Sequence, residues 1–380
     1  MPGMLLTAGT VIAPDAVHSP GWVDLRSGRV VAVGDGEPPR KPDFRFPHGI
    51  IAPGFVDVHS HGGGGASFDD PDTADAAARV TATHLSHGTT TMIASLVTAP
   101  LDALECRVTE LADLVEQGLI AGIHLEGPWL SPTHRGAHTE SLLRPPHADD
   151  VARILRAARG TVRMVTIAPE LDGAFRAIRQ IVDSGAVAAI GHTDANYDLT
   201  RRAIAAGATV GTHLFNAMPP LHHREPGPVR ALLEDPRVFA EAIADGVHLH
   251  PAILRLIATS ASRLVLVTDA MAAAGAVDGA YTLGGLDVSV ANGQARLADG
   301  TIAGSVLTLS AAVKHAVDVA ELPLADAVRA ATETPADMLG LLDRGRLAAG
   351  ARADIVVLDA DLAVSTTMHA GEWCGASPER

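Results

Sequence analysis

Eight short apolar segments recur along the chain, and stretches with helical periodicity separate them. The segments are Gly54–His59, Thr90–Val97, Leu119–Glu126, Val162–Ala168, Val187–His192, Thr209–His213, Phe239–Asp245 and Leu264–Asp269. The intervening stretches, such as DTADAAARVTATHLSHG, end in glycine, which is typical of helix C-termini. Strands that alternate with helices in series predict parallel βαβ units, and eight such units predict an α/β protein with a (β/α)8 TIM-type barrel.

The two ends of the chain differ in pattern from the middle. Residues 1–53 and 345–380 contain short stretches in which apolar and polar residues alternate between Gly, Pro and Asp. We therefore expect the two ends to build one small β-sandwich domain together, and residues 54–344 to form the catalytic barrel. The length of 380 residues fits a barrel of about 250 residues with a small additional domain.

Charge and composition exclude several classes of protein. The net charge of -15 argues against binding of nucleic acid or of an anionic membrane, because both attract basic surfaces. No apolar run approaches the length of a membrane span, and the N-terminus lacks the pattern of a signal peptide. The two cysteines, Cys106 and Cys374, imply no disulfide framework. We therefore expect a cytoplasmic protein.

Residues of metal-binding or catalytic type end most of the predicted strands, and we single out those that fit one site. These residues are His59, Glu126, His192, His213 and Asp269. In a barrel the carboxyl ends of the strands converge on one rim, and active sites form there. Residues that are far apart in the sequence, such as His59 and Asp269, are therefore expected to be neighbours.

His59 and His61 form an HxH pattern at the end of the first predicted strand. Residues i and i+2 of an extended strand point to the same side, so both imidazoles can bind one divalent ion. An isolated HxH pattern is more often incidental than a metal site. Here it precedes Gly62–Gly65 and accompanies the other strand-end residues, which favours a metal site.

Glu126, His192 and His213 extend the predicted metal site. A buried carboxylate needs a partner, so Glu126 binds either a metal or a basic side chain. Each histidine taken alone is as compatible with a hydrogen-bonded core residue as with a ligand. Together these nitrogen and oxygen donors suit zinc, iron or a similar ion that keeps a position for water.

Asp269 ends the apolar run RLVLVTDAM. The residue is either the N-cap of a helix or a general base. We favour the general base, which would take a proton from metal-activated water and later give it to a leaving amine.

Five motifs, PGFVDVHSHGGGG, HLEGPWLSPTHRGAH, IGHTDA, THLFNAM and LVTDAM, follow one another along the chain. In these motifs the chain resembles the N-acetylglucosamine-6-phosphate deacetylases of the amidohydrolase superfamily. The segments DGTIAGSVLTL and GRLAAGARADIVVLD also fit, although ADIVVLD is common to the wider superfamily. The resemblance implies a hydrolase that converts N-acetyl-D-glucosamine 6-phosphate to D-glucosamine 6-phosphate and acetate, in amino-sugar catabolism and recycling.

The resemblance also implies how the metal is held and used. Glu126, His192 and His213 would hold the main ion, and His59 and His61 would add a second site. We expect one or two divalent ions per subunit, with zinc as the first choice and iron, cobalt, manganese or cadmium as alternatives. Metal-activated water would attack the amide carbonyl with Asp269 as general base and acid, while His138 would stabilise the oxyanion.

A set of substrate contacts follows from the same resemblance. The residues are Ala137, His138, Asn216, Ala217, His222, Arg224, His248, Ile302, Ala303 and Gly304. Arg224 is the expected phosphate anchor, because a guanidinium forms bidentate contacts with phosphate oxygens. In the family this loop reaches into the neighbouring subunit, so we expect a homodimer in which His222 and Arg224 serve the partner's site.

Two other functions stay open on the sequence. Another amidohydrolase, such as a cyclic-amide hydrolase or an amino-acid deacylase, would not need the phosphate anchor. An inactive barrel that acts as a scaffold would lose metal ligands, whereas this chain retains the complete set. Six histidines outside the motifs are assigned no role in the site: His18, His48, His84, His87, His315 and His369.

Overall fold

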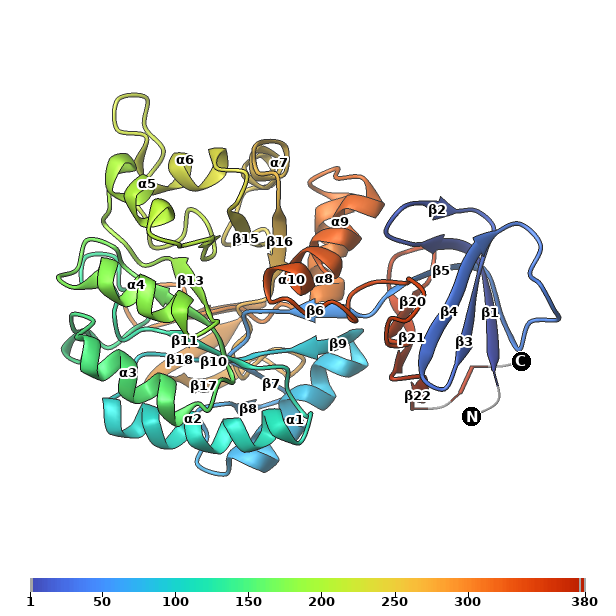
Figure 1. Cartoon of the computed structure of the whole chain (residues 1–380), viewed down its shortest axis with the longest axis horizontal. Helices are drawn as coiled ribbons and strands as arrows, with labels where there is room; N and C mark the ends of the chain where they lie inside the picture. The colour runs from blue at the N-terminus through green and yellow to red at the C-terminus, as the bar shows by residue number, and fades with distance from the viewer. Residues whose placement is uncertain (1–2, 376, 379–380) are drawn as a thin grey trace. The chain divides into compact units, whose positions relative to one another are not determined.

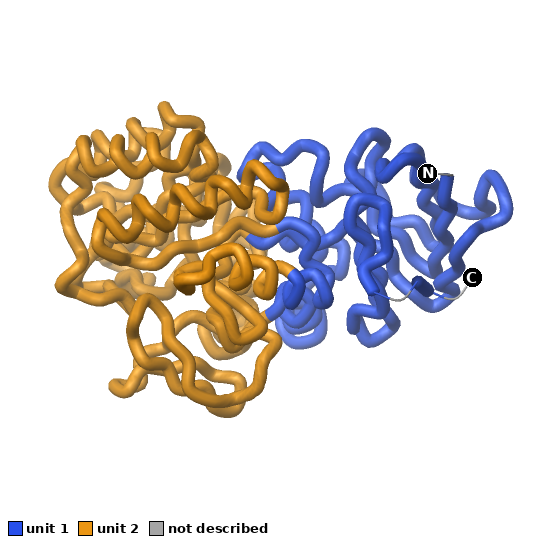
Figure 2. Tube along the Cα trace, turned by 90° about the horizontal axis from the view of Figure 1, so that it is seen from below, with its two compact units in different colours: residues 1–57, 82–91, 308–380 blue, residues 58–81, 92–307 orange. Residues whose placement is uncertain are grey.

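The computed structural model describes residues 3–375 and 377–378. The chain divides into two compact units (Figure 2). Unit 1 contains residues 1–57, 82–91 and 308–380, and unit 2 contains residues 58–81 and 92–307. Helix α1 (Thr73–Ser86) and strand β9 (Thr89–Met92) cross the boundary between the units. Within the described residues, no helix has the length and apolar character that a membrane crossing requires.

Unit 1 is built around one sheet to which both ends of the chain contribute, in the order β22-β21-β20-β5-β1-β3-β4 with β2 beside β1 (Figure 1). The strands are β1 Met4–Ile12, β2 Val17–His18, β3 Gly21–Arg26, β4 Arg29–Asp35, β5 Phe44–Pro53, β20 Ile355–Leu358, β21 Val364–His369 and β22 Glu372–Cys374. In β3 buried and partly exposed residues alternate, as in a sheet with one covered face. Val23 and Leu25 of β3 join Ile51, Ile355 and Met368 in one apolar core.

The remaining elements of unit 1 are β6 (Phe55–Asp57), which pairs with β9, and helices α8 (Leu309–Asp318), α9 (Leu324–Ala330) and α10 (Glu333–Met338). Strands from both chain ends therefore share a sheet, as the alternating patterns predicted. The description of this region as a sandwich, and the domain boundaries 1–53 with 345–380 and 54–344, stay predictions.

Unit 2 contains a parallel sheet in the order β10-β11-β12-β13-β14-β15-β16. The strands are β10 Ala94–Leu96, β11 Ile123–Glu126, β12 Val162–Ile167, β13 Val187–Ile190, β14 Val210–Gly211, β15 Phe239–Ile243 and β16 Leu264–Val267. Nearly every residue of these strands is buried, because a parallel sheet is covered on both faces. This burial explains why the strands appear in the sequence as apolar runs.

One helix follows each strand from β10 to β15, and these helices lie on the outer side of the strands (Figure 1). They are α2 Leu101–Glu116, α3 Ala148–Ala157, α4 Ala174–Asp183, α5 Tyr197–Ala205, α6 Gly227–Glu234 and α7 Pro251–Ser260. Helix α5 starts where the side chain of Asn196 accepts a hydrogen bond from the backbone N–H of Leu199. The repeated strand-helix order is the predicted one.

Residues 58–61 lie between the two edges of the parallel sheet. The backbone N–H of Ser95 donates to the carbonyl of Ser60 (2.9 Å), and that of His61 donates to the carbonyl of Ala270 (2.8 Å). Ser60 and Ala270 also form a parallel bridge. The segment thus connects the β10 edge with the end of β16, a closure consistent with the predicted TIM-type barrel.

The chain leaves the parallel sheet after β16 and forms a three-stranded antiparallel sheet from β17 (Gly279–Leu283), β18 (Leu286–Ala291) and β19 (Gln294–Arg296). Its apolar side packs with Val97 and Met271, which follow β10 and β16. Shorter elements are β7 (Gly62–Gly63), β8 (Ala66–Ser67) and the 3-10 helix Glu140–Leu142.

Candidate active site

Two overlapping groups of donor atoms lie at the carboxyl end of the parallel sheet. The first ligand set contains His59, His61, Glu126 and Asp269, and the second contains Glu126, His192 and His213. Within each set all donor atoms lie within 4.8 Å of one another, and all of these residues are buried. Glu126 belongs to both sets. The structure therefore brings together the strand-end residues and the HxH pair that the sequence singled out.

The first ligand set is arranged around the two imidazoles of the HxH pattern. His59 Nε2 and His61 Nε2 are 3.3 Å apart, so the alternation of an extended backbone does place both rings on one side. His61 Nε2 lies 3.1 Å from Glu126 Oε2 and 3.2 Å from Asp269 Oδ1. Two carboxylates and two imidazoles thus face one small volume.

The second ligand set uses the other oxygen of Glu126. Glu126 Oε1 lies 3.0 Å from His213 Nε2 and 3.1 Å from His192 Nε2, and these two nitrogens are 3.1 Å apart. One carboxylate therefore connects both sets. Its Oε2 atom faces His61, and its Oε1 atom faces the second set and also lies 3.5 Å from His59 Nε2.

Backbone turns at the strand ends aim three of these side chains. His192, His213 and Asp269 have φ values of 45°, 26° and 50°. Left-handed backbone is uncommon for residues other than glycine and is typical of functional sites, where the surrounding structure stabilises it. Each turn comes within two residues of the end of β13, β14 or β16.

Burial and neighbouring charges have opposite effects on the pKa values of the two histidines in the first set. Burial lowers the pKa of His61, but its contacts with Asp269 and Glu126 outweigh burial and raise the pKa to about 9. Burial also lowers the pKa of His59, whereas the charges of Glu126 and Asp269 together raise it well above its usual value. A divalent cation at this position would interact favourably with the same two carboxylates.

In contrast, the pKa values of His192 in the second set and of the two carboxylates are lowered. Burial lowers the pKa of His192 to about 4, so its imidazole is neutral near pH 7. Burial raises the pKa of Glu126, but the charge of His59 and the contacts with neighbouring histidines hold it well below its usual value. For Asp269 the effect of burial is likewise outweighed, mainly by His59 and His61, and its pKa is low. Both carboxylates are therefore ionised.

Contacts behind the rings orient the metal-facing nitrogens. The Nδ1 atom of His61 donates to the carbonyl of Ser95 (3.1 Å), and Nδ1 of His192 donates to the carbonyl of His134 (2.9 Å). Because a carbonyl can only accept, the proton of each neutral ring lies on Nδ1 and the lone pair on Nε2. Once their Nε2 atoms carry no proton, these imidazoles and the ionised carboxylates form a donor set that fits a divalent ion such as zinc or iron.

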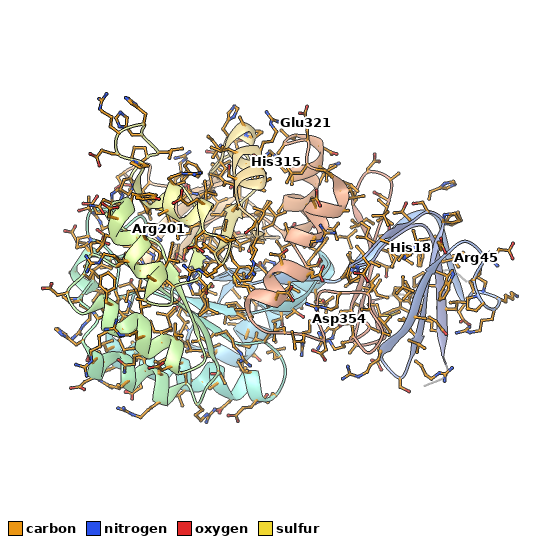
Figure 3. The ribbon with its side chains drawn as sticks, turned by 45° about the horizontal axis from the view of Figure 1, so that its top comes forward. His18, Arg45, Arg201, His315, Glu321 and Asp354 are labelled. Atoms are coloured by element: carbon orange, nitrogen blue, oxygen red, sulfur yellow. The ribbon has the colours of Figure 1, made fainter. Side chains whose placement is uncertain are left out.

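A pocket of about 670 Å³ opens next to the two ligand sets. Its lining includes these predicted site residues: His61, Glu126, Ala137, His138, His192, His213, Asn216, Ala217, His248, Asp269, Ile302 and Gly304. All lining residues belong to unit 2. The six histidines to which the sequence assigned no role belong to unit 1, among them His18 and His315, labelled in Figure 3.

Three predicted contact residues do not line this pocket. Ala303 is fully buried in the apolar cluster of Met271 and Leu283, next to the lining residues on either side of it. His222 and Arg224 lie in an exposed loop, where the guanidinium of Arg224 donates to His223 Nε2 (2.8 Å). Their assignment to a partner's site concerns a second subunit and stays a prediction.

His138 lines the pocket with its Nε2 atom near the metal ligands. The backbone N–H of Thr98 donates to His138 Nδ1 (3.3 Å), and the Thr98 hydroxyl lies 2.9 Å from the same atom. A backbone amide can only donate, so Nδ1 accepts and the proton of the neutral ring lies on Nε2, which is 3.6 Å from Glu126 Oε2. His138 can therefore donate a hydrogen bond into the pocket.

His248 is oriented by a carboxylate that sequence reasoning missed. Asp245 Oδ2 accepts from His248 Nδ1 (2.7 Å), and Asp245 Oδ1 accepts from the backbone N–H groups of Val247 and His248. These bonds outweigh the effect of burial and lower the pKa of Asp245. His248 also lines the pocket. Asp245 ends the seventh predicted strand, which was the signal that could have identified it.

Comparison with known proteins places the chain in a family. Residues 50–377 match the amidohydrolase family. The chain is 35% identical to N-acetylglucosamine-6-phosphate deacetylase of Bacillus subtilis (strain 168), over 99% of this chain and 98% of the relative. It is 38% identical to N-acetylgalactosamine-6-phosphate deacetylase of Escherichia coli O157:H7, over 85% and 87%.

Among solved structures, a mutant of N-acetyl-D-glucosamine-6-phosphate deacetylase from Mycobacterium smegmatis, in complex with N-acetyl-D-glucosamine-6-phosphate, is 54% identical. The match covers 98% of this chain and 99% of that protein, with a TM-score of 0.95. These matches confirm the resemblance found in the sequence motifs, and the chain belongs to the amidohydrolase family.

Proposed function

We propose that this chain is a metal-dependent deacetylase that hydrolyses N-acetyl-D-glucosamine 6-phosphate to D-glucosamine 6-phosphate and acetate. The observation that carries the proposal is the shared carboxylate of Glu126, which connects two histidine sets beside a pocket that also contains Asp269 and His138. The named relatives support the same activity.

Glu126, His192 and His213 would hold one divalent ion, and His59, His61, Glu126 and Asp269 have the donor atoms for a second. We propose zinc as the native ion, with iron, cobalt, manganese or cadmium as alternatives. A bound ion supplies Lewis-acid chemistry that makes water nucleophilic near neutral pH.

Asp269 is proposed as the general base and acid. Its carboxylate is ionised at neutral pH, so it can take a proton from the attacking water. The same group then returns the proton to the nitrogen as the amide bond breaks. His138 would donate from Nε2 to the carbonyl oxygen and stabilise its developing negative charge, because Thr98 keeps the proton of the ring on that nitrogen.

The amino sugar would occupy the pocket of unit 2. Its lining includes Ala137, Asn216, Ala217, Ile302 and Gly304. His248, oriented by Asp245, would contact a sugar hydroxyl. Ala303 would act by packing its neighbours into place, since it is fully buried.

The phosphate needs a local cation, since the net charge of -15 would otherwise repel it. We propose Arg224 as the anchor, acting together with His222 on the neighbouring subunit of a homodimer. The exposure of their loop in a single chain is compatible with this arrangement. The proposal also includes a cytoplasmic location, where phosphorylated sugars are metabolised.

A second candidate substrate is N-acetylgalactosamine 6-phosphate. One relative at 38% identity carries that activity in its name. The two sugars differ in the orientation of one hydroxyl group.

The deciding experiment measures acetate release by metal-replete protein. The substrates are N-acetylglucosamine 6-phosphate, its unphosphorylated form and N-acetylgalactosamine 6-phosphate. We expect the highest kcat/KM for the first. A preference for the unphosphorylated sugar would contradict the proposal, and a preference for the galacto sugar would change the substrate. Arg224→Ala should raise the KM for the phosphorylated sugar only.

Asp269→Asn tests the proton transfer. We expect turnover to fall by about 10²- to 10⁴-fold while the sugar phosphate still binds, because general acid-base catalysis contributes about that much. Isothermal titration with substrate would measure the binding. A fully active variant would exclude the assigned role.

A further inference from the structure

Glu241 is a buried carboxylate that none of the functional assignments above uses. It lies in the middle of β15, in the sequence FAEAI, and its side chain is fully buried. Burying a carboxylate is costly unless hydrogen bonds or a cation compensate for it. Among the described residues, the ion pairs of Glu241 include no lysine or arginine, and its partner is His59. The free-energy cost of burying this carboxylate suggests that Glu241 serves a function.

Within residues 3–375 and 377–378, both hydrogen-bond contacts of this carboxylate go to proposed metal ligands. Glu241 Oε2 lies 3.2 Å from His59 Nδ1 and 3.2 Å from the backbone nitrogen of His213. His59 belongs to the first ligand set and His213 to the second. The other oxygen, Oε1, has no hydrogen-bond partner within the part of the chain that is described. A single oxygen atom, Oε2, thus contacts one residue of each set, at atoms other than the Nε2 atoms that face the proposed metal.

The chemistry of the donors determines the direction of these bonds. A backbone N–H can only donate, and a carboxylate can only accept, so His59 donates from Nδ1. The Nε2 atom of His59 then faces Glu126 Oε1 and Asp269 Oδ1, each at 3.5 Å. At His213 the bond holds the left-handed turn that ends β14.

We propose that Glu241 is a positioning residue for the metal site, which orients the ring of His59 and fixes the turn at His213. The inference rests on the proposed metal-dependent function. A carboxylate behind an imidazole ligand fixes the ring and raises the basicity of the metal-facing nitrogen. The equivalent positions behind His61 and His192 are backbone carbonyls, so Glu241 is the one of these three supports that a substitution can remove.

The test is a metal titration of the metal-free protein that does not depend on turnover. Co²⁺ is added to the wild type, Glu241→Ala and Glu241→Gln, and Kd and the visible absorption spectrum are recorded. We expect Glu241→Ala to weaken binding by about 10- to 100-fold, the usual effect of losing such a partner. Glu241→Gln keeps an oxygen acceptor without the charge, so a smaller loss, up to about tenfold, is expected.

Asp235→Asn is the matched control. Asp235 is also a buried carboxylate of unit 2, but its partner is Arg237 rather than a metal ligand. The control should retain the wild-type Kd. The Tm of each metal-free variant separates the two possible roles, because a purely structural residue would lower the Tm and leave the Kd unchanged.

Wild-type Kd values in both folded Glu241 variants would overturn the inference. If the alanine variant does not fold, a wild-type Kd in Glu241→Gln is sufficient to overturn it. Failure of the proposed function gives a different result, namely wild-type protein that binds Co²⁺ but releases no acetate from any of the sugar phosphates.

Discussion

The two ligand sets share Glu126 but differ in the charges that their imidazoles face. In the first set Asp269 and Glu126 both contact His61 and raise its pKa to about 9. In the second set burial dominates at His192 and lowers its pKa to about 4. A metal must displace protons from the first set, whereas His192 of the second set is already neutral at pH 7. Burial also lowers the pKa of His213, but its contacts with Glu126 raise it, so His192 is the histidine that separates the second set from the first. We propose that the second set holds its ion more firmly at neutral pH.

The first set also contains the group proposed to move protons. Asp269 lies 3.2 Å from His61 Nε2 and lines the pocket, so it can serve as a ligand or as a base. The carboxylate of the second set is Glu126, which both sets share as a ligand. We therefore assign ion retention mainly to the second set, and expect the first set to combine metal binding with catalysis.

Replacing the shared ligand should have the largest effect, because it removes the feature that the sets have in common. We expect Glu126→Gln to lose stoichiometric metal and to lower kcat/KM by at least about 10³-fold, equivalent to about 4 kcal/mol of transition-state stabilisation. Metal analysis and acetate release measure the two effects. Glu140→Gln is the control, since Glu140 lines the pocket and pairs with Arg135 outside both sets. Full metal content in Glu126→Gln would contradict the shared role.

Removing one histidine from each set tests whether the second set holds its ion more firmly than the first. We expect His213→Ala to lose the more firmly held ion and to reduce activity by about 10²-fold more than His59→Ala, a difference of roughly 2.7 kcal/mol. His59→Ala should retain one equivalent of metal. Metal content per subunit, measured after dialysis, checks the prediction. The reverse order would assign the main ion to the HxH set.

The pH dependence of metal binding sharpens the same comparison. His61 is protonated in the metal-free protein below its pKa of about 9, and that proton must leave before Nε2 can bind an ion. The apparent affinity of the first set should therefore rise with pH, by up to about tenfold between pH 7 and pH 8 for the His61 proton and further for the proton of His59. His192, with a pKa of about 4, adds no such dependence in this range. Chelator competition at the two pH values measures it, and equal affinities would contradict the assignment.

The smallest effect is expected outside both sets, at Asp245. Asp245→Asn removes the charge that orients His248, and a charge-assisted hydrogen bond is roughly twice as strong as a neutral one. We expect the KM for the sugar phosphate to rise about fivefold, equivalent to roughly 1 kcal/mol, with unchanged metal content. Steady-state kinetics and metal analysis check this. A loss of metal instead would link Asp245 to the ligand sets.

Much of the site could be predicted because its residues share a position in the fold. His59, Glu126, His192, His213 and Asp269 each follow or end an apolar run, and parallel strands bring their carboxyl ends to one rim. The strand-helix repeat was predictable for the same reason, since burial on both faces produces continuous apolar runs. The substrate assignment depended on resemblance, because contacts such as Asn216 and Gly304 have no local pattern of their own.

The sequence by itself determined which donors meet, since that follows from the periodic order of strands along the chain. Only the tertiary structure decided how those donors are supported. Glu241 lies 182 residues from His59, and Thr98 lies 40 residues from His138. Neither is marked by periodicity, spacing or neighbouring residues. Hydrogen-bond direction and burial depend on distances between strands and loops, and those distances exist only once the strands have assembled into the sheet.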